Sequence, residues 1–324
     1  MQKLILTLSL IIIGLITGYI IQRLVLSGKI KADKALTKQR LILQDVALLI
    51  LNPVAAMGAM WILSFHNIRI AFMPLIGALA IGTGGISALI LAKLVKMKQQ
   101  QAGAFFISGA ICNLGAIGGL IVFIFLGEEA YALVPIYQIF ESIIYFTIWF
   151  PLAKSFSPHL EANIKSKRLL KIITDPFVIV TLLSIVIGLS LNFLNIPRPT
   201  WYSTLNTCII PLMSLLLLMS IGMAMKFGKI KAYLKPALII ASLKFLFVPF
   251  IATGVAYLLG FGSIDNGLPL KVILILSSMP VGFIALVPPS IYDLDIDLAN
   301  AAWLLTTGML VVIIPLQMLI ISFI

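Results

Sequence analysis

Long hydrophobic stretches alternate with short polar connections along almost the whole chain of 324 residues. A helix of about 20 apolar residues crosses the roughly 30 Å hydrocarbon core of a bilayer. The stretches lack the period-two alternation that is typical of strands in outer-membrane barrels. The pattern therefore predicts an all-α integral membrane protein with ten spans, at residues 4–26, 41–64, 70–92, 101–126, 130–152, 174–194, 203–225, 236–259, 271–291 and 298–323.

Two of these predicted spans are interrupted by small and polar residues. The fourth span is broken at residues 112–119 and the ninth at residues 277–282. Unwound backbone inside a bilayer is tolerated only where it is buried in protein or lines a cavity. Matched breaks in the two halves of a chain are typical of the binding site of a secondary transporter.

The two breaks lie five spans apart, which suggests an internal repeat. An odd number of spans in each half makes the second half enter the membrane from the opposite side. We therefore predict a first five-helix repeat over residues 1–152, a cytoplasmic linker over 153–171 and an inverted second five-helix repeat over 172–324.

Composition and charge agree with a membrane protein. Hydrophobic residues make up 61% of the chain and charged residues 10%, which excludes an ordinary soluble domain. Lys and Arg gather in the connections after the odd-numbered spans, whereas the alternate connections hold only Arg69, Arg198 and Lys271. By the positive-inside rule, both termini are extracytoplasmic in a plasma or inner cell membrane. The net charge of +12 then favours contact with membrane lipids, and no nucleic-acid partner is expected.

Enzymatic chemistry finds no support in the sequence. The two cysteines, Cys112 and Cys208, fall inside apolar segments, and His66 and His159 lie in connections on opposite sides of the membrane. No nucleotide loop, metal-spaced cluster or catalytic triad pattern is visible. We expect no cofactor, no metal site and no enzyme activity.

Several short motifs occur in a characteristic order and spacing, and together they carry a family resemblance. They are residues 113–118, 127–129, 169–171, 175–176, 218–223, Lys244, 278–280, 286–287 and Tyr292. In these positions the chain resembles the auxin efflux carrier family, within the bile acid/auxin/arsenite superfamily that also holds the bile-acid sodium symporters. The resemblance covers nearly the whole chain.

The resemblance implies a bile-acid-symporter-like fold, in which ten helices form an inverted repeat and helices 4 and 9 are broken and cross near the midplane. Helices 1, 2, 6 and 7 would form a scaffold against which the other six move. Substrates of such families are small organic anions. The chain has Leu120 where many members have a proline and Ile284 where relatives often have a polar residue, so its polar site is sparse.

Asn113 is the sharpest candidate for substrate binding. Its amide can donate and accept at the break, while the backbone N–H groups of Gly115, Gly118 and Gly119 can face an anion at the positive end of a half-helix. The structural alternative is an asparagine that bonds across helices, with glycines that allow close approach.

The break in the ninth span offers a second set of candidates. Pro280 removes one hydrogen bond of the helix, so that Ser277 and Ser278 and the freed carbonyls can meet a cation or a substrate hydroxyl. For Pro280 itself a structural role, holding the break open, is the favoured interpretation.

Two ionisable residues lie deep in predicted spans, where charges are costly and are functional hypotheses by default. Glu141, flanked by Tyr137 and Tyr145, is a candidate for binding and releasing a coupling proton. Lys244 is a candidate partner of a substrate carboxylate or a substitute for a coupling cation; snorkelling to the interface or pairing with Glu141 is the alternative.

The sequence thus predicts a secondary transporter that moves a small organic anion, such as a mono- or dicarboxylate, by alternating access. A sodium-coupled symporter of the bile-acid type is the nearest alternative, and a channel-like or sensory membrane protein is an alternative of another class. Proton coupling, sodium coupling and a homodimer all stay open at this stage.

Overall fold

The computed structural model describes residues 2–27, 33–63, 67–158 and 176–324. These residues form helices and connecting turns, and β-structure among them is limited to one isolated bridge between Cys112 and Val281. His66, His159 and most of the predicted linker 153–171 lie outside the described residues, as do the motif at 169–171 and Asp175.

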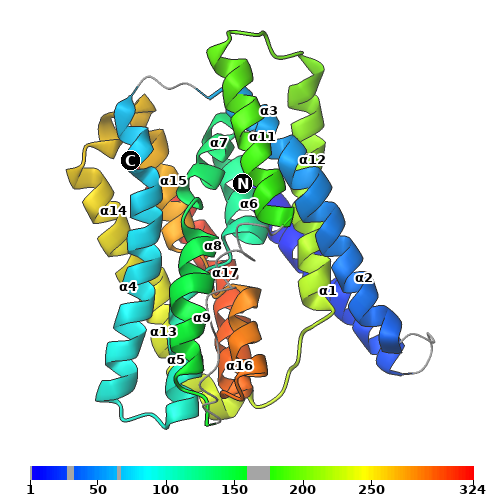
Figure 1. Cartoon of the computed structure of the whole chain (residues 1–324), viewed down its shortest axis with the longest axis vertical. Coiled ribbons are helices and arrows are strands. Elements are labelled where there is room, and N and C mark those ends of the chain that lie inside the picture. Colours follow the sequence, from blue (N-terminus) through cyan, green and yellow to red (C-terminus); the bar gives the residue numbers. More distant parts are fainter. Residues whose placement is uncertain (1, 28–32, 64–66, 159–175) are drawn as a thin grey trace. The chain divides into compact units, whose positions relative to one another are not determined.

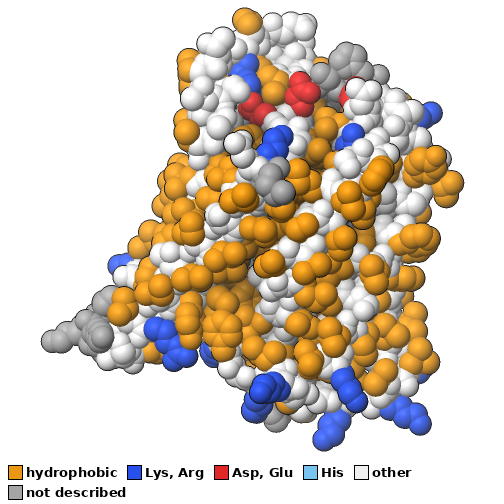
Figure 2. Space-filling model, turned by 180° about the vertical axis from the view of Figure 1, so that it is seen from behind, with side chains coloured by type: hydrophobic (Ala, Val, Ile, Leu, Met, Phe, Trp, Pro, Cys, Tyr) orange, Lys and Arg blue, Asp and Glu red, His pale blue; other side chains and the backbone are white. Residues whose placement is uncertain are grey.

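Helices that can cross a membrane dominate the described part of the chain. Seven are long and apolar enough, and they overlap predicted spans 1, 2, 3, 5, 7, 8 and 10: Gln2–Leu26, Leu36–Trp61, Ile68–Leu94, Glu128–Lys154, Trp201–Gly222, Ile230–Leu258 and Ile296–Ile321. Hydrophobic side chains cover much of the surface seen in Figure 2. The prediction of a helical membrane protein is confirmed, whereas the ten-helix inverted repeat and the orientation of the termini stay predictions.

The remaining predicted spans are shorter or broken helices. Span 4 is divided into α5 (Gln99–Ala110) and α6 (Gly119–Leu126), joined through the π-helical turn η3 (Leu114–Gly118). Span 9 is divided into α15 (Leu268–Ser277) and α16 (Val287–Ile291), and span 6 corresponds to α11 (Pro176–Phe193). Both expected breaks are therefore present.

The chain forms two compact units, each with segments from both halves of the sequence. Unit 1 comprises Met1–Phe65, Gly115–Pro135 and Ile173–Lys226. It holds α6, α11, most of α7 (Glu128–Tyr137), α1 (Gln2–Leu26), α2 (Asp33–Asp45), η1 (Val46–Leu51), α3 (Asn52–Trp61) and α12 (Trp201–Gly222).

Unit 2 comprises His66–Leu114, Ile136–Ile172 and Phe227–Ile324. It contains α5, α15, α16 and the following elements: η2 (Ile68–Phe72), α4 (Met73–Leu94), α8 (Glu141–Ile144), η4 (Tyr145–Trp149), α9 (Phe150–Lys154), η5 (Ile230–Tyr233), α13 (Leu234–Ser242), η6 (Leu243–Phe247), α14 (Val248–Leu258), η7 (Phe261–Ser263), η8 (Asp265–Gly267), η9 (Phe283–Leu286) and α17 (Ile296–Ile321).

Small residues let the helices of unit 1 approach one another closely. α1 packs along α12, as Figure 1 shows, and α3 packs along α11. Gly14 and Gly18 are one helical turn apart on α1, and a Cβ at Gly18 would clash with the backbone of Met219 and Gly222 on α12. Apolar surface gains little from association in lipid, so close backbone contact of this kind stabilises helix pairs in membranes.

Unit 2 is organised in the same way around α4 and α5. A Cβ at Gly84 on α4 would clash with the carbonyl of Gly109 on α5, and Gly109 in turn packs against Ala88. α13 packs against α17, and α14 packs against α15 and α4. This packing holds the broken helix α5 beside the helices that carry the polar groups described below.

A buried ion pair joins the start of α7 to the connection that precedes α12 in unit 1. Glu128, the first residue of α7, receives a two-pronged contact from Arg198, whose Nη2 lies 3.0 Å from Oε2. The two side chains are only 11% and 12% exposed. Asn206 and Ser203 of α12 donate to the same carboxylate, and Arg198 also donates to the Gly58 carbonyl at 2.8 Å. The Glu128 carboxylate thereby accepts four hydrogen bonds, two of them from Arg198.

Removal of one partner of this pair leaves the other charge buried and unpaired. Glu128→Ala is expected to reduce the stability of the folded state by roughly 3–5 kcal/mol, seen as a marked fall of the thermal unfolding midpoint in detergent. Lys229→Ala is the matched control, because its ion pair with Asp297 joins side chains that are 70% and 40% exposed. Equal shifts for the two variants would contradict this assignment.

Candidate functional site

The two broken segments meet inside unit 2. After α5 ends at Ala110, the backbone becomes extended, with φ −93° and ψ 130° at Ile111. This segment pairs antiparallel with the one that follows α15: the Asn113 N–H donates to the Pro280 carbonyl at 2.9 Å, and the Gly282 N–H donates to the Ile111 carbonyl at 3.1 Å. The crossing, residues 111–113 and 280–282, therefore restores hydrogen bonds that the breaks remove from each helix.

Close approach at the crossing depends on Gly282 and on α17. A Cβ at Gly282 would lie 2.5 Å from the Cys112 carbonyl oxygen, too close for any other side chain. On the neighbouring residue, the Val281 N–H donates to Thr306 Oγ1 of α17 at 3.2 Å. Thr306 thus binds a backbone group that the paired segment leaves unsatisfied.

Lys244 reaches the crossing from η6. Its side chain is 1% exposed, and Nζ donates to the Ile111 carbonyl and to Cys112 Sγ, each at 3.0 Å. The side chain is buried within the protein, so snorkelling to the membrane interface does not describe it. No ion pair between Lys244 and Glu141 occurs among the described residues.

The charge of Lys244 lies where two half-helices end. Both α5 and α15 point their C-termini at the crossing, and each helix C-terminus carries the equivalent of roughly −0.5 elementary charge. The helical turns η3 and η9 begin just after the two segments, and their N-termini carry the opposite partial charge. The Lys244 ammonium therefore offsets the carbonyl ends of α5 and α15 locally.

Tyr145 connects the crossing to Glu141. The Cys112 N–H donates to the Tyr145 hydroxyl oxygen at 3.1 Å, and Glu141 lies close enough to this hydroxyl to interact with it. Glu141 also interacts electrostatically with Lys244. A continuous polar path thus runs from Glu141 through Tyr145 and Cys112 to Lys244.

Each of the helices that supply these groups contains a π-helical turn at the relevant position. Tyr145 begins η4, Lys244 is the second residue of η6, and η3 follows Asn113 directly. A π-turn inserts one extra residue into a helix and is frequently found at functional sites. The extra residue reorients the side chains that would otherwise follow the regular 3.6-residue period.

Asn113 is the candidate whose side chain lacks a partner. It is 7% exposed, and its amide makes no hydrogen bond within the part of the chain that the structure describes. The next helical turn begins at Leu114, so Asn113 also stands directly before a helix N-terminus. The hydrogen-bonding groups of this amide are therefore available to a ligand.

The serines of the second break are committed to hydrogen bonds within the protein. Ser277 and Ser278 both donate to the Leu274 carbonyl in the last turn of α15. Ser278 also accepts a hydrogen bond of 2.6 Å from Gln317 Nε2 of α17. Pro280, in contrast, supplies its carbonyl to the crossing.

The three candidate glycines follow the crossing along the chain. Gly115 and Gly118 lie in η3 and Gly119 begins α6, and all three belong to unit 1. The crossing itself is built from unit 2 alone. Gly115 is exposed, and a Cβ there would meet no atom within 4 Å.

Some residues of the crossing were not predicted from the sequence. Cys112 accepts from Lys244, and Thr306 and Gln317 reach the second break from α17. A glutamine in an apolar span is an intramembrane polar group, and this was the available signal for Gln317. The described residues contain no group of three side chains suited to hold a metal ion.

A similarity to a known protein bears on what this arrangement does. The chain is 22% identical over 253 residues to a protein of Methanothermobacter thermautotrophicus that is named an uncharacterized transporter, with 76% of this chain and 78% of that protein covered. No protein-family model matches the chain. Together with the apolar helices, this similarity supports a membrane transporter in general.

Gly282→Ala tests the close contact at the crossing. The added methyl group has no room beside the Cys112 carbonyl, and overpacking of this kind costs about 1–3 kcal/mol of stability. Gly308→Ala on α17 is the matched control, because a Cβ there meets no atom within 4 Å. Thermal unfolding of the purified variants should show a lower midpoint for Gly282→Ala only; an unchanged midpoint would refute the close contact.

Proposed function

We propose that the chain is a secondary transporter that moves a small organic anion across the membrane by alternating access. The observation that carries the proposal is the crossing of two broken helices, with the unpartnered amide of Asn113 and the buried ammonium of Lys244 beside it. Polar groups of this kind within an apolar helical protein mark a substrate pathway by default.

Asn113 supplies the direct contact with the substrate. A carboxylate accepts hydrogen bonds, and the Asn113 amide nitrogen has two donors to offer. The site combines the Asn113 amide and the Lys244 ammonium group with buried apolar neighbours in the chain, such as Leu114 and Val281. Such a site fits a small substrate with one or two carboxylates and an apolar body.

Lys244 makes the crossing acceptable to an anion. By balancing the carbonyl ends of α5 and α15, its ammonium removes the negative field that would otherwise repel a carboxylate. It also binds the Ile111 carbonyl, one of the oxygens freed by the break and therefore one that a coupling cation would use. This arrangement favours transport without sodium over the sodium-coupled alternative.

Uptake by proteoliposomes tests the role of Lys244. Lys244→Gln removes the charge while keeping a polar side chain, so uptake of a mono- or dicarboxylate should fall at least about tenfold, the effect of 1.4 kcal/mol. Lys235→Ala, which removes an exposed lysine from α13, is the control and should transport normally. Wild-type uptake that vanishes without sodium, or full uptake by Lys244→Gln, would count against the proposal.

Glu141 provides a route for proton coupling. The Tyr145 hydroxyl accepts from the Cys112 N–H, which leaves its own proton available to the nearby Glu141 carboxyl. A change in the protonation of Glu141 would thus alter the interactions of the Tyr145 hydroxyl, which in turn contacts the backbone of the crossing at Cys112. We assign Glu141 as the proton carrier of the transport cycle.

Glu141→Gln tests this coupling. The amide still bonds Tyr145 but cannot take up or release a proton, so the variant should bind substrate yet lose the acceleration of uptake by an imposed pH gradient. Tyr145→Phe should weaken the same response because it interrupts the path to Cys112. If Glu141→Gln keeps the full response to the gradient, Glu141 does not carry the proton.

A further inference from the structure

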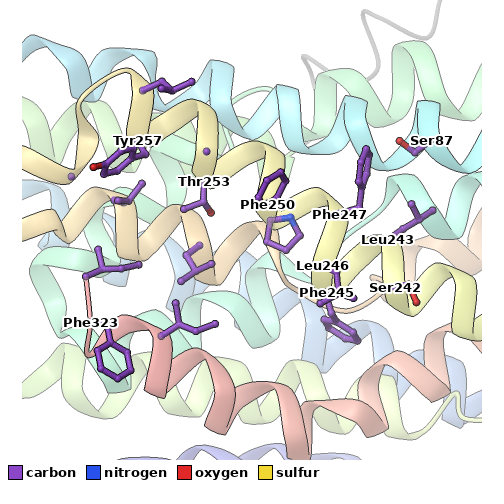
Figure 3. A pocket seen from close by; sticks show the side chains of 18 of the residues that line it. Ser87, Ser242, Leu243, Phe245, Leu246, Phe247, Phe250, Thr253, Tyr257 and Phe323 are labelled. Atoms are coloured by element: carbon purple, nitrogen blue, oxygen red, sulfur yellow. The ribbon is translucent and has the colours of Figure 1, made fainter.

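We propose that unit 2 binds an anionic phospholipid in an apolar groove along α14, with the lipid phosphate at Arg69. The groove has a volume of about 1740 Å³ and lies among α4, α14, α15 and α17 (Figure 3). It is distinct from the crossing at Cys112 and Val281, and no step of the proposed transport uses it.

Side chains from several helices of unit 2 line the groove. Leu270 and Leu274 of α15 line it, together with Ile320 of α17 and Phe323, which follows α17. On α14 itself, Phe250, Thr253 and Tyr257 contribute to the lining, and Figure 3 shows these side chains at successive positions along the helix.

The exposure of this lining is that of a lipid-facing surface. Leu246, Phe250 and Leu258 are 70%, 77% and 84% exposed. Along the continuous helical stretch the lining extends from Ile239 to Leu258, which corresponds to roughly 28 Å at about 1.5 Å per residue. Since the hydrocarbon core is roughly 30 Å thick, the groove offers an acyl chain a complete path from the core to one interface.

A cation, Arg69, lies next to one end of the groove. Arg69 Nη1 donates to the Gly260 carbonyl at 3.5 Å, and the Ser263 hydroxyl donates to the same oxygen at 2.9 Å. Both side chains therefore converge on Gly260, which lines the groove. Their convergence places a guanidinium group and a hydroxyl group together where α14 ends.

Arg69 has hydrogen-bonding capacity left for a ligand. Its guanidinium carries five N–H donors, and within the described ranges its side chain makes the Gly260 contact and no ion pair. Planar guanidinium donors match the oxygens of a phosphate. Tyr257, which is 67% exposed, adds an amphipathic ring of the kind that is enriched at the membrane interface.

An anionic phospholipid matches both features of the groove. Its phosphate is complementary in charge to Arg69, and its acyl chains are complementary to the apolar lining next to Phe250 and Phe323. Basic pockets between membrane helices bind anionic headgroups in this way. A zwitterionic lipid would offer the same tails but would bring a competing cation toward Arg69.

Native mass spectrometry of the full chain with added phosphatidylglycerol tests the proposal. Phosphatidylcholine with the same acyl chains is the comparison. Wild-type protein should retain phosphatidylglycerol preferentially, and Arg69→Gln should weaken this retention about tenfold or more, as expected for the loss of charge-assisted hydrogen bonds. Arg23→Gln, which removes an exposed arginine stacked on Tyr19 of α1, should leave it unchanged.

A second variant tests the groove without changing charge. A Cβ at Gly254 in the groove and a Cβ at Gly308 on α17 each meet no atom within 4 Å, so both positions accept a larger residue. Gly254→Phe should displace the lipid, whereas Gly308→Phe should retain it. Equal retention of the two lipids by wild-type protein would overturn the proposal, as would unchanged retention in both Arg69→Gln and Gly254→Phe. A lipid-free dimer that Gly254→Phe dissociates would assign the groove to a second copy instead.

Discussion

One carbonyl oxygen, that of Ile111, holds the candidate site together. It accepts the Gly282 N–H at 3.1 Å and the Lys244 ammonium at 3.0 Å, so it links the two broken segments and the buried charge. The constraint behind this is general, because a polar backbone group in lipid that lacks a partner costs several kcal/mol. A helix that breaks within a membrane must find partners for its freed groups, and here each break supplies partners for the other.

The same constraint limits what the site can bind. Two helix C-termini at one point form a negative field, and a protein can balance it with a mobile cation or with a fixed one. Lys244 provides the fixed cation, since its side chain is 1% exposed and is hydrogen-bonded to the crossing. A fixed charge does not leave with the substrate, so any coupling ion must act elsewhere. Glu141, connected through Tyr145, is the proposed place.

The sequence predicted the breaks but not the network around them. Asn113 and Pro280 were recognisable because small and polar residues interrupt long apolar runs, and Lys244 and Glu141 because charges are rare there. The partners of Lys244 were not recognisable, since π-turns such as η6 shift side chains by one residue and leave no clear sequence pattern. Thr306 and Gln317 are far from the break in sequence, and only the packing of α17 brings them to it. The ten-helix repeat and its orientation still rest on the charge pattern and the family resemblance.

Asn113 lies close to the point where the chain passes from one unit to the other, which bears on the proposed transport cycle. The chain passes from unit 2 to unit 1 between Leu114 and Gly115, directly after Asn113, and returns after Pro135 inside α7. Gly115 is exposed, has open space around its Cβ position and lies in a π-turn, which interrupts the regular helical hydrogen bonding. A proline inside a helix likewise removes a hydrogen bond. A substrate that binds the Asn113 amide would therefore act close to the point where the chain passes between the units, and it would shift the populations of two states by as much as its contacts differ between them.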